Sequence, residues 1–260
     1  MTRFEYGAAT SVGHVRKVNE DSLLVNPPLF AVADGMGGHG AGDLASSLAI
    51  GAVKEAAGLR PLSEDGVLAA LDGANRAIIT YEGAPGMGTT ITGLALVETP
   101  GGDRLMVFNV GDSRVYRLSG ADLVQVTTDH SEVQELVEAG VITRDEARIH
   151  PRRNIVTRAL GTTPPCRPDR WLLSAIAGDR YMACSDGLYS ELTDERIAVL
   201  LASGHPQGAA EALVAAAEAA GGHDNITVIV IDVVRFGDLG DYSEADVPTV
   251  PWREVPNGLA

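Results

Sequence analysis

Four aspartates stand at the ends of apolar segments, each beside or close to glycine or asparagine. Asp34, Asp112 and Asp186 each follow an apolar run that is typical of a buried strand, and Asp224 precedes the last such run. A single Asp-Gly pair would more often be a tight turn or a helix cap. The recurrence instead predicts that the four carboxylates converge on one acidic site. Because like charges at short range destabilise one another, a bound metal ion is the simplest way to neutralise that site.

The predicted ligands are all oxygen atoms, which favours Mg²⁺ or Mn²⁺ over zinc. A structural calcium site is the alternative, but calcium loops usually hold carboxylates that are close in sequence, whereas these are spread from Asp34 to Asp224. Two ions that share a carboxylate would lower the pKa of a water towards about 7 and would neutralise charge on a phosphoryl group. Arg16 is the candidate for binding the phosphate oxygens, because guanidinium binds phosphate through two parallel hydrogen bonds. An ordinary surface arginine is the alternative at that position.

The composition is that of an acidic globular protein. The 260 residues carry a formal net charge of −15, and 45% of them are hydrophobic, which is enough for a substantial core. The negative charge argues against nucleic acid as a partner, because phosphate backbones bind basic surfaces. The apolar runs are too short to span a bilayer, and residues 1–20 lack the apolar centre of a signal peptide. We therefore expect a cytoplasmic protein without a membrane partner.

One segment departs from this acidic balance. Seven arginines lie between residues 144 and 170, against three acidic residues. The segment is either a solvated loop or a lip that attracts an anionic substrate.

The hydrophobic periodicity predicts strands in runs and helices in pairs. Strands are expected at 4–12, 22–33, 88–98, 104–110, 113–118, 122–126, 179–184 and 226–234. The four between 88 and 126 are short, are separated by Gly and Asp turns and are expected to form a meander. Helices are expected at 41–57, at about 67–79, in short segments that start near 131 and 143, at 193–202 and at 206–220. This order favours an α+β fold with antiparallel sheets covered by helices over a doubly wound nucleotide-binding fold. We expect one domain over residues 1–236 and a flexible acidic tail with prolines over 237–260.

Taken together and in this order, these motifs resemble the metal-dependent Ser/Thr protein phosphatases, the PPM or type 2C family, and in particular its compact bacterial members. The resemblance extends from about residue 4 to 235. Each motif alone is weak, whereas the ordered set is specific. The matching stretches are 16–21, 32–38, 88–90, 109–114, 128–130, 157–161, 185–187 and 223–227.

The resemblance implies a central antiparallel β-sandwich flanked by pairs of antiparallel helices, with a metal site at one edge of the sandwich. Asp34 would bridge two ions, and Asp186 and Asp224 would complete the coordination of the first. The carbonyl of Gly35 and water molecules would serve the second. Asp112, together with Asp186, matches a third and weaker metal site of bacterial members.

The resemblance also implies roles around the ions. Glu20 and Asp21 would order the water molecules, and Arg16 would hold the substrate phosphate. The basic segment 141–161 matches a mobile flap beside the site, which agrees with its excess of arginine.

One position departs from the pattern of many eukaryotic members, which carry a histidine after the Asp-Gly pair that is proposed as general acid. This chain has Met36 there, as is usual in bacterial members, and a thioether cannot donate a proton. The proton for the leaving group must then come from a metal-bound water or another residue. His39 is three residues further on and does not match the position.

The resemblance implies hydrolysis of phosphoserine and phosphothreonine on proteins at a dinuclear Mn²⁺ or Mg²⁺ site, reversing a bacterial Ser/Thr kinase. Phosphoproteins, including a cognate kinase, would be the partners of a monomeric enzyme. A catalytically inactive phosphoprotein-binding regulator is one alternative, which the presence of all four aspartates disfavours. A sensor-coupled phosphatase of sigma-factor regulators is another, which the lack of a sensory domain disfavours.

Overall fold

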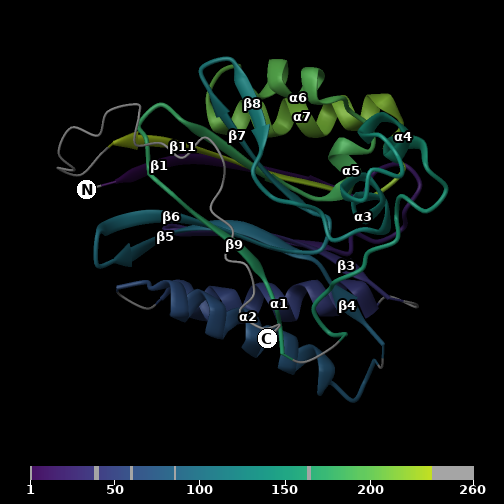
Figure 1. Cartoon of the computed structure of the whole chain (residues 1–260), viewed down its shortest axis with the longest axis horizontal. Coiled ribbons are helices and arrows are strands. Elements are labelled where there is room, and N and C mark those ends of the chain that lie inside the picture. The colour runs from purple at the N-terminus through teal and green to yellow at the C-terminus, as the bar shows by residue number, and fades with distance from the viewer. Residues whose placement is uncertain (1, 38–40, 59–60, 85, 163–164, 236–260) are drawn as a thin grey trace.

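Two antiparallel sheets lie face to face, and a pair of helices covers the outer face of each (Figure 1). The computed structural model describes residues 2–37, 41–58, 61–84, 86–162 and 165–235. The predicted α+β fold is confirmed. His39 and the tail 237–260 lie outside the described residues.

The first sheet joins the two ends of the described chain and is covered by α6 and α7 (Figure 1). Its strands, in spatial order, are β1 (Arg3–Ser11), β11 (Ile226–Arg235), β10 (Arg180–Cys184), β7 (Arg114–Ser119) and β8 (Asp122–Gln125). The helices that follow β10 are α5 (Asp186–Tyr189), α6 (Asp194–Leu201) and α7 (Pro206–Ala220).

The second sheet is covered by α1 (Ala41–Ala57) and α2 (Glu64–Ile79) (Figure 1). Its strands, in spatial order, are β2 (Asp21–Asn26), β3 (Leu29–Met36), β5 (Ile91–Thr99), β6 (Gly102–Val110) and β9 (Asp169–Leu173). The short strand β4 (Gly88–Thr89) pairs with the end of β3.

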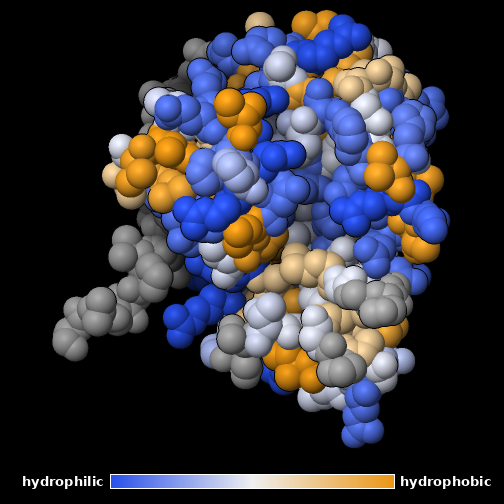
Figure 2. Space-filling view, turned by 90° about the vertical axis from the view of Figure 1, so that its right-hand side faces the viewer, coloured by the Kyte–Doolittle hydropathy of each residue, from blue (hydrophilic) through white to orange (hydrophobic). Residues whose placement is uncertain are grey.

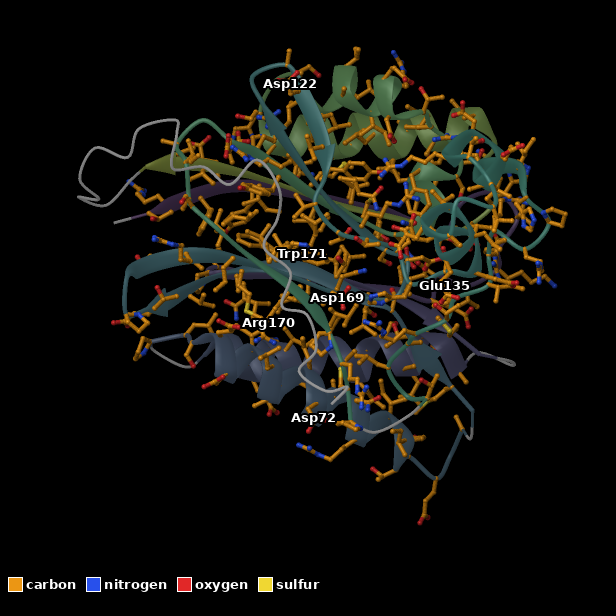
Figure 3. All side chains as sticks on the ribbon, in the orientation of Figure 1. Asp72, Asp122, Glu135, Asp169, Arg170 and Trp171 are labelled. Atoms are coloured by element: carbon orange, nitrogen blue, oxygen red, sulfur yellow. The ribbon has the colours of Figure 1, made fainter. Side chains whose placement is uncertain are left out.

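Strand β3 shows how one sheet packs against the other sheet on one face and against helices on the other. Its side chains alternate between the two faces of the sheet, as the period of a strand requires. Phe30 and Val32 pack between the sheets, whereas Ala31 and Ala33 pack in the apolar layer that includes α1. The alanines are small, so the helix approaches the strand closely. Strand β9 alternates in the same way, with Trp171 buried between the sheets (Figure 3).

The segment between β8 and β9 contains two short helices, α3 (Glu132–Glu138) and α4 (Arg144–Ile149). A side-chain cap begins each helix. The hydroxyl of Ser131 accepts a hydrogen bond from the amide of Gln134 at 3.3 Å, and Thr143 and Glu146 form a complete capping box. We call residues 141–161 the arginine segment.

Three expectations about the strands are wrong. The run 22–33 is two strands, β2 and β3, joined through a cis Pro27–Pro28 bond. The strands expected from 88 to 126 do not form one meander, because β5 and β6 belong to the second sheet and β7 and β8 to the first. Strand β9 was not among the expected strands. Its periodicity is too short to detect, and pairing with β6 stabilises it.

None of the helices in the described part of the chain combines the length and the apolar character that crossing a bilayer requires.

Candidate active site

The fold brings the four aspartates to one end of the sandwich. Asp34 lies near the end of β3, Asp112 follows β6, Asp186 begins α5 directly after β10, and Asp224 precedes β11. Burial raises the pKa of Asp34 well above its usual value, and the neighbouring charges of Asp21 and the other three aspartates raise it further. The strand-end pattern in the sequence therefore did indicate a shared acidic site.

Asp21 belongs to the same cluster. It lies directly opposite Asp34 on the neighbouring strand, where two like charges destabilise a sheet. Ser185 donates a hydrogen bond to Asp21 Oδ2 at 2.8 Å, but Asp21 Oδ1 is buried and has no hydrogen-bond partner. Burial raises the pKa of Asp21 to about 7.

Asp186 has a similar environment. Burial and the charge of Asp224 raise its pKa to about 6, and a hydrogen bond with Asp34 opposes that shift. Its Oδ1 atom is also buried without a hydrogen-bond partner. Buried carboxylate oxygens without donors are rare in folded proteins, and a cation is one group that satisfies them. The donor set and the two orphaned oxygens fit Mn²⁺ or Mg²⁺.

The side chains as they stand do not form a finished coordination sphere. Within the described residues, no group of three or more His, Cys, Asp and Glu side chains is arranged to hold an ion. Two of the carboxylates are engaged elsewhere, Asp21 with Ser185 and Asp224 with Arg16. The structure therefore brings the predicted ligands into electrostatic contact without arranging them around a common centre.

Arg16 reaches this cluster from the loop between β1 and β2. Its Nη2 atom lies 2.6 Å from Asp224 Oδ2, and half of its side chain is exposed. The hydrogen bond to Asp224 raises the pKa of Arg16. The structure thus places Arg16 at the acidic site with a carboxylate as its partner, within reach of an anion at the rim.

Glu20 and Gly35 lie where β3 meets the first turn of α1. The amide of Gly35 donates to the carbonyl of Glu20 at 3.2 Å. A Cβ atom on Gly35 would lie 2.0 Å from the carbonyl oxygen of Gly42, and one on Gly42 would lie 2.9 Å from Glu20 Oε1. Only glycine permits this close approach of strand, helix and Glu20.

Known proteins match this chain over most of its length. The sequence profile of the protein phosphatase 2C family matches residues 10–218. The chain belongs to the protein phosphatase 2C family. The serine/threonine protein phosphatase PstP of Mycobacterium tuberculosis is 41% identical over 239 residues, which cover 89% of this chain and 45% of PstP. The chain thus spans about half the length of that relative.

Shorter relatives and solved structures agree with this family assignment. The serine/threonine phosphatase Stp of Listeria monocytogenes is 35% identical, with 86% of this chain and 93% of Stp covered. The crystal structure of PstP from M. tuberculosis superimposes with a TM-score of 0.84 at 38% identity, covering 90% of this chain and 100% of that one. A structure of the PstP catalytic domain in complex with two manganese ions gives a TM-score of 0.81 at 37% identity, with the same coverage.

In this protein phosphatase 2C domain, several residues that the sequence did not single out support the aspartates. The hydroxyl of Thr89 donates to the carbonyl of Asp34 at 2.8 Å, and the amide of Asp34 donates to the hydroxyl of Thr90 at 3.0 Å. These threonines stand in one of the matching stretches, which was the available signal. Ser185, which donates to Asp21, also stands in a matching stretch, directly before Asp186.

A second support holds the turn that carries Asp112. The hydroxyl of Tyr189 donates to the carbonyl of Asp112 at 2.9 Å, and the guanidinium of Arg114 stacks 3.5 Å from the centre of the Tyr189 ring. Arg114 also forms a buried ion pair with Asp129, with 2.6 Å between Nη2 and Oδ2. Nothing in the sequence around Tyr189 pointed to this role.

His130 links the Asp112 turn to the arginine segment. Its Nδ1 atom accepts a hydrogen bond from the amide of Gly111 at 3.0 Å. Its Nε2 atom lies 3.3 Å from Asp169 Oδ2, and Asp169 also pairs with Arg158 at 2.9 Å. Through His130 and Asp169, Arg158 of the arginine segment is thus connected to the turn that contains Gly111 and Asp112.

Proposed function

We propose that this chain hydrolyses phosphoserine and phosphothreonine on proteins at a site that holds two Mn²⁺ or Mg²⁺ ions. The observation that carries the proposal is the cluster of buried carboxylates, two with orphaned oxygens, beside a half-exposed arginine. Named relatives of the same family are Ser/Thr protein phosphatases. When bound, the ions supply an activated water and neutralise charge on the phosphoryl group.

The residues that would hold the ions follow from the family resemblance. Asp34 would be shared between two ions, with Asp186 and Asp224 on one and the carbonyl of Gly35 on the other. Asp112 with Asp186 would form a weaker third position. Glu20 and Asp21 would order water.

Arg16 would hold the substrate phosphate. Its present partner is Asp224, so phosphate binding exchanges a carboxylate for a phosphate oxygen on the same guanidinium. Met36 stands beside the cluster and carries no proton that it could donate. The proton for the leaving serine or threonine oxygen must therefore come from another group.

The substrate is a phosphoprotein, and a cognate Ser/Thr kinase is one such partner in this proposal. The enzyme would act as a cytoplasmic monomer through the domain 1–236. The face that surrounds the site is mostly hydrophilic with scattered apolar side chains (Figure 2). Val15 and Val18, on either side of Arg16, and Ile149 and Ile155 of the arginine segment are exposed and are available to a polypeptide.

The test is turnover of p-nitrophenyl phosphate and a phosphothreonine peptide with and without Mn²⁺. We expect activity that is lost in chelator and restored by Mn²⁺ or Mg²⁺, because the ligands are oxygen atoms. Full activity after chelation, with metal loss verified by elemental analysis, would contradict the metal-dependent mechanism. Phosphopeptide binding without turnover would indicate the inactive regulator instead.

A further inference from the structure

The loop that carries Arg16 is closed at its neck by one buried side chain, that of Asn225. Asn225 Nδ2 donates to the carbonyls of Val12 and Val18, each at 3.0 Å, and Asn225 Oδ1 accepts from the amide of Glu20 at 2.8 Å. The side-chain amide has two donor hydrogens and one carbonyl oxygen, and all of them are used. Asn225 thus fastens both ends of residues 12–20, and Asn19 Nδ2 adds a bond across the same neck by donating to Thr10 Oγ1 at 2.8 Å.

The backbones of the two loops are also in contact. The amide of His14 donates to the carbonyl of Gly222 at 2.7 Å. A Cβ atom on Gly13, whose φ is +72°, would lie 2.3 Å from the carbonyl oxygen of Asp224. The loop of Arg16 therefore rests on the loop that carries Asp224 and Asn225, and Arg16 pairs with Asp224 across this contact.

We propose that Asn225 is a positioning residue that holds Arg16 at the phosphate site by closing the neck of the 12–20 loop. This inference rests on the proposed function, since it assigns Arg16 to the phosphate. Asn225 is only 5% exposed, so its loss leaves two carbonyls and one amide without their partner. A loop with an open neck samples more conformations, and fewer of them place the guanidinium correctly.

The first experiment is a double-mutant cycle of Asn225→Ala and Arg16→Ala. Alone, Asn225→Ala should raise KM for p-nitrophenyl phosphate and the inhibition constant of inorganic phosphate by about tenfold, the scale of one lost hydrogen-bonded contact. The change in kcat should stay within about threefold. In the Arg16→Ala background, the same substitution should change KM by less than about twofold.

Equal effects of Asn225→Ala in both backgrounds would overturn the proposal, because Asn225 would then not act through Arg16. A fall in kcat at unchanged KM would also overturn it and would assign Asn225 to the support of Asp224. The matched control is Asn75→Ala, which removes another buried asparagine, one that accepts from the amide of Gly161 at 2.7 Å. It should lower thermal stability without raising KM. Should Asn225→Ala not fold, Asn225→Ser replaces it in the cycle.

A second measurement does not depend on turnover. In chelator, amide hydrogen exchange at Glu20 should be at least about tenfold faster in Asn225→Ala than in the wild type, with β3 unchanged. Unchanged exchange would overturn the positioning role. Faster exchange in a chain that does not hydrolyse phosphoesters would support the positioning role and contradict the proposed function, so the two can fail separately.

Discussion

The carboxylates at the end of the sandwich and the arginines between residues 144 and 170 differ in how their charges are satisfied. Both are groups of like charge, but the arginines are close in sequence, whereas the carboxylates come from distant parts of the chain. The carboxylates are buried together and retain two oxygens without hydrogen-bond partners. Most of the arginines are instead paired within the chain.

The arginines hold structure through those pairs. Arg148 donates to the carbonyl of Leu192 at 3.1 Å, which fastens α4 to the turn between α5 and α6. Arg152 pairs with Glu132, and Arg158 and Arg170 pair with Asp169 and Glu64. Asp169 and Arg170 stand on β9 at the edge of the second sheet (Figure 3). Unsatisfied charge therefore marks the site, whereas a high density of charge does not.

The largest effect should come from removing one carboxylate of the acidic cluster. Asp34→Asn and Asp224→Asn should each lower kcat/KM by roughly 10²–10³-fold, the scale seen when a group that stabilises developing charge is lost. Neither should unfold the chain, because neutralising one carboxylate of the cluster relieves repulsion, and Asp224 is partly exposed. Asp122→Asn, in the β7–β8 turn and away from the site, is the control (Figure 3). Wild-type rates in either variant would refute the assignment of that aspartate.

A smaller effect should follow from removing the arginine beside the carboxylates. Arg16→Ala should raise KM by about tenfold for p-nitrophenyl phosphate and for phosphopeptides alike, because the phosphate is common to both. Lys17→Ala, next to it on the same loop, should leave both values unchanged. An effect confined to peptides would mean that Arg16 binds the polypeptide rather than the phosphate.

The metal-free carboxylates should also show in the pH dependence of stability. The pKa values of Asp21 and Asp186 are raised in the fold to about 7 and about 6, from about 3.9 in an unfolded chain. Between the unfolded and the folded pKa values, the folded state thus binds more protons than the unfolded state. The contribution of the two carboxyl groups to the free energy of unfolding is therefore complete below about pH 4 and is lost as the pH rises through 6 to 7. Thermal unfolding in chelator should show this loss. A wild-type midpoint that changes no more steeply with pH than that of Asp21→Asn would contradict it.

The smallest effect should come from the arginines of this segment that form no ion pair in the described part of the chain. Within the described residues, Arg144 and Arg153 form no ion pair, so they are available to steer an acidic phosphopeptide. Arg144→Ala with Arg153→Ala should lower kcat/KM for such a peptide by about two- to threefold at low salt, and the difference should fade as salt screens the charges. The small substrate should be unaffected. Equal slowing of both substrates would make the segment part of the catalytic scaffold.

The sequence predicted the cluster of carboxylates better than the pairing of the arginines. Aspartates at strand ends predicted the acidic cluster, because an apolar run that ends at an aspartate is a local pattern, and it recurs in this chain. Arg152 belongs to the arginine-rich segment that the sequence offers as a lip for an anionic substrate, yet it pairs with Glu132. Which arginines are satisfied depends on contacts such as Arg148 with Leu192, between residues far apart in sequence. No local pattern encodes such contacts.

The fold shows the same limit. Helices α1, α2, α6 and α7 were predicted closely, because their apolar faces extend over several turns. The hairpin of β2 and β3 was read as one strand, although Pro27 and Pro28 were a signal against it. Nothing in the sequence of β7 and β8 indicates that they belong to the first sheet rather than to the sheet of β5 and β6.

The pairing of β1 with β11 sets the order of events during synthesis of the chain. Strand β1 leaves the ribosome before the other described strands, but its partner β11 is the last of them. Asp224 and Asn225 immediately precede that strand. A nascent chain can therefore form the helical hairpin of α1 and α2 early, whereas the acidic site is complete only after residues 224–235 have emerged. Fragments from premature termination before this point would lack Asp224 and Asn225, and therefore part of the acidic site.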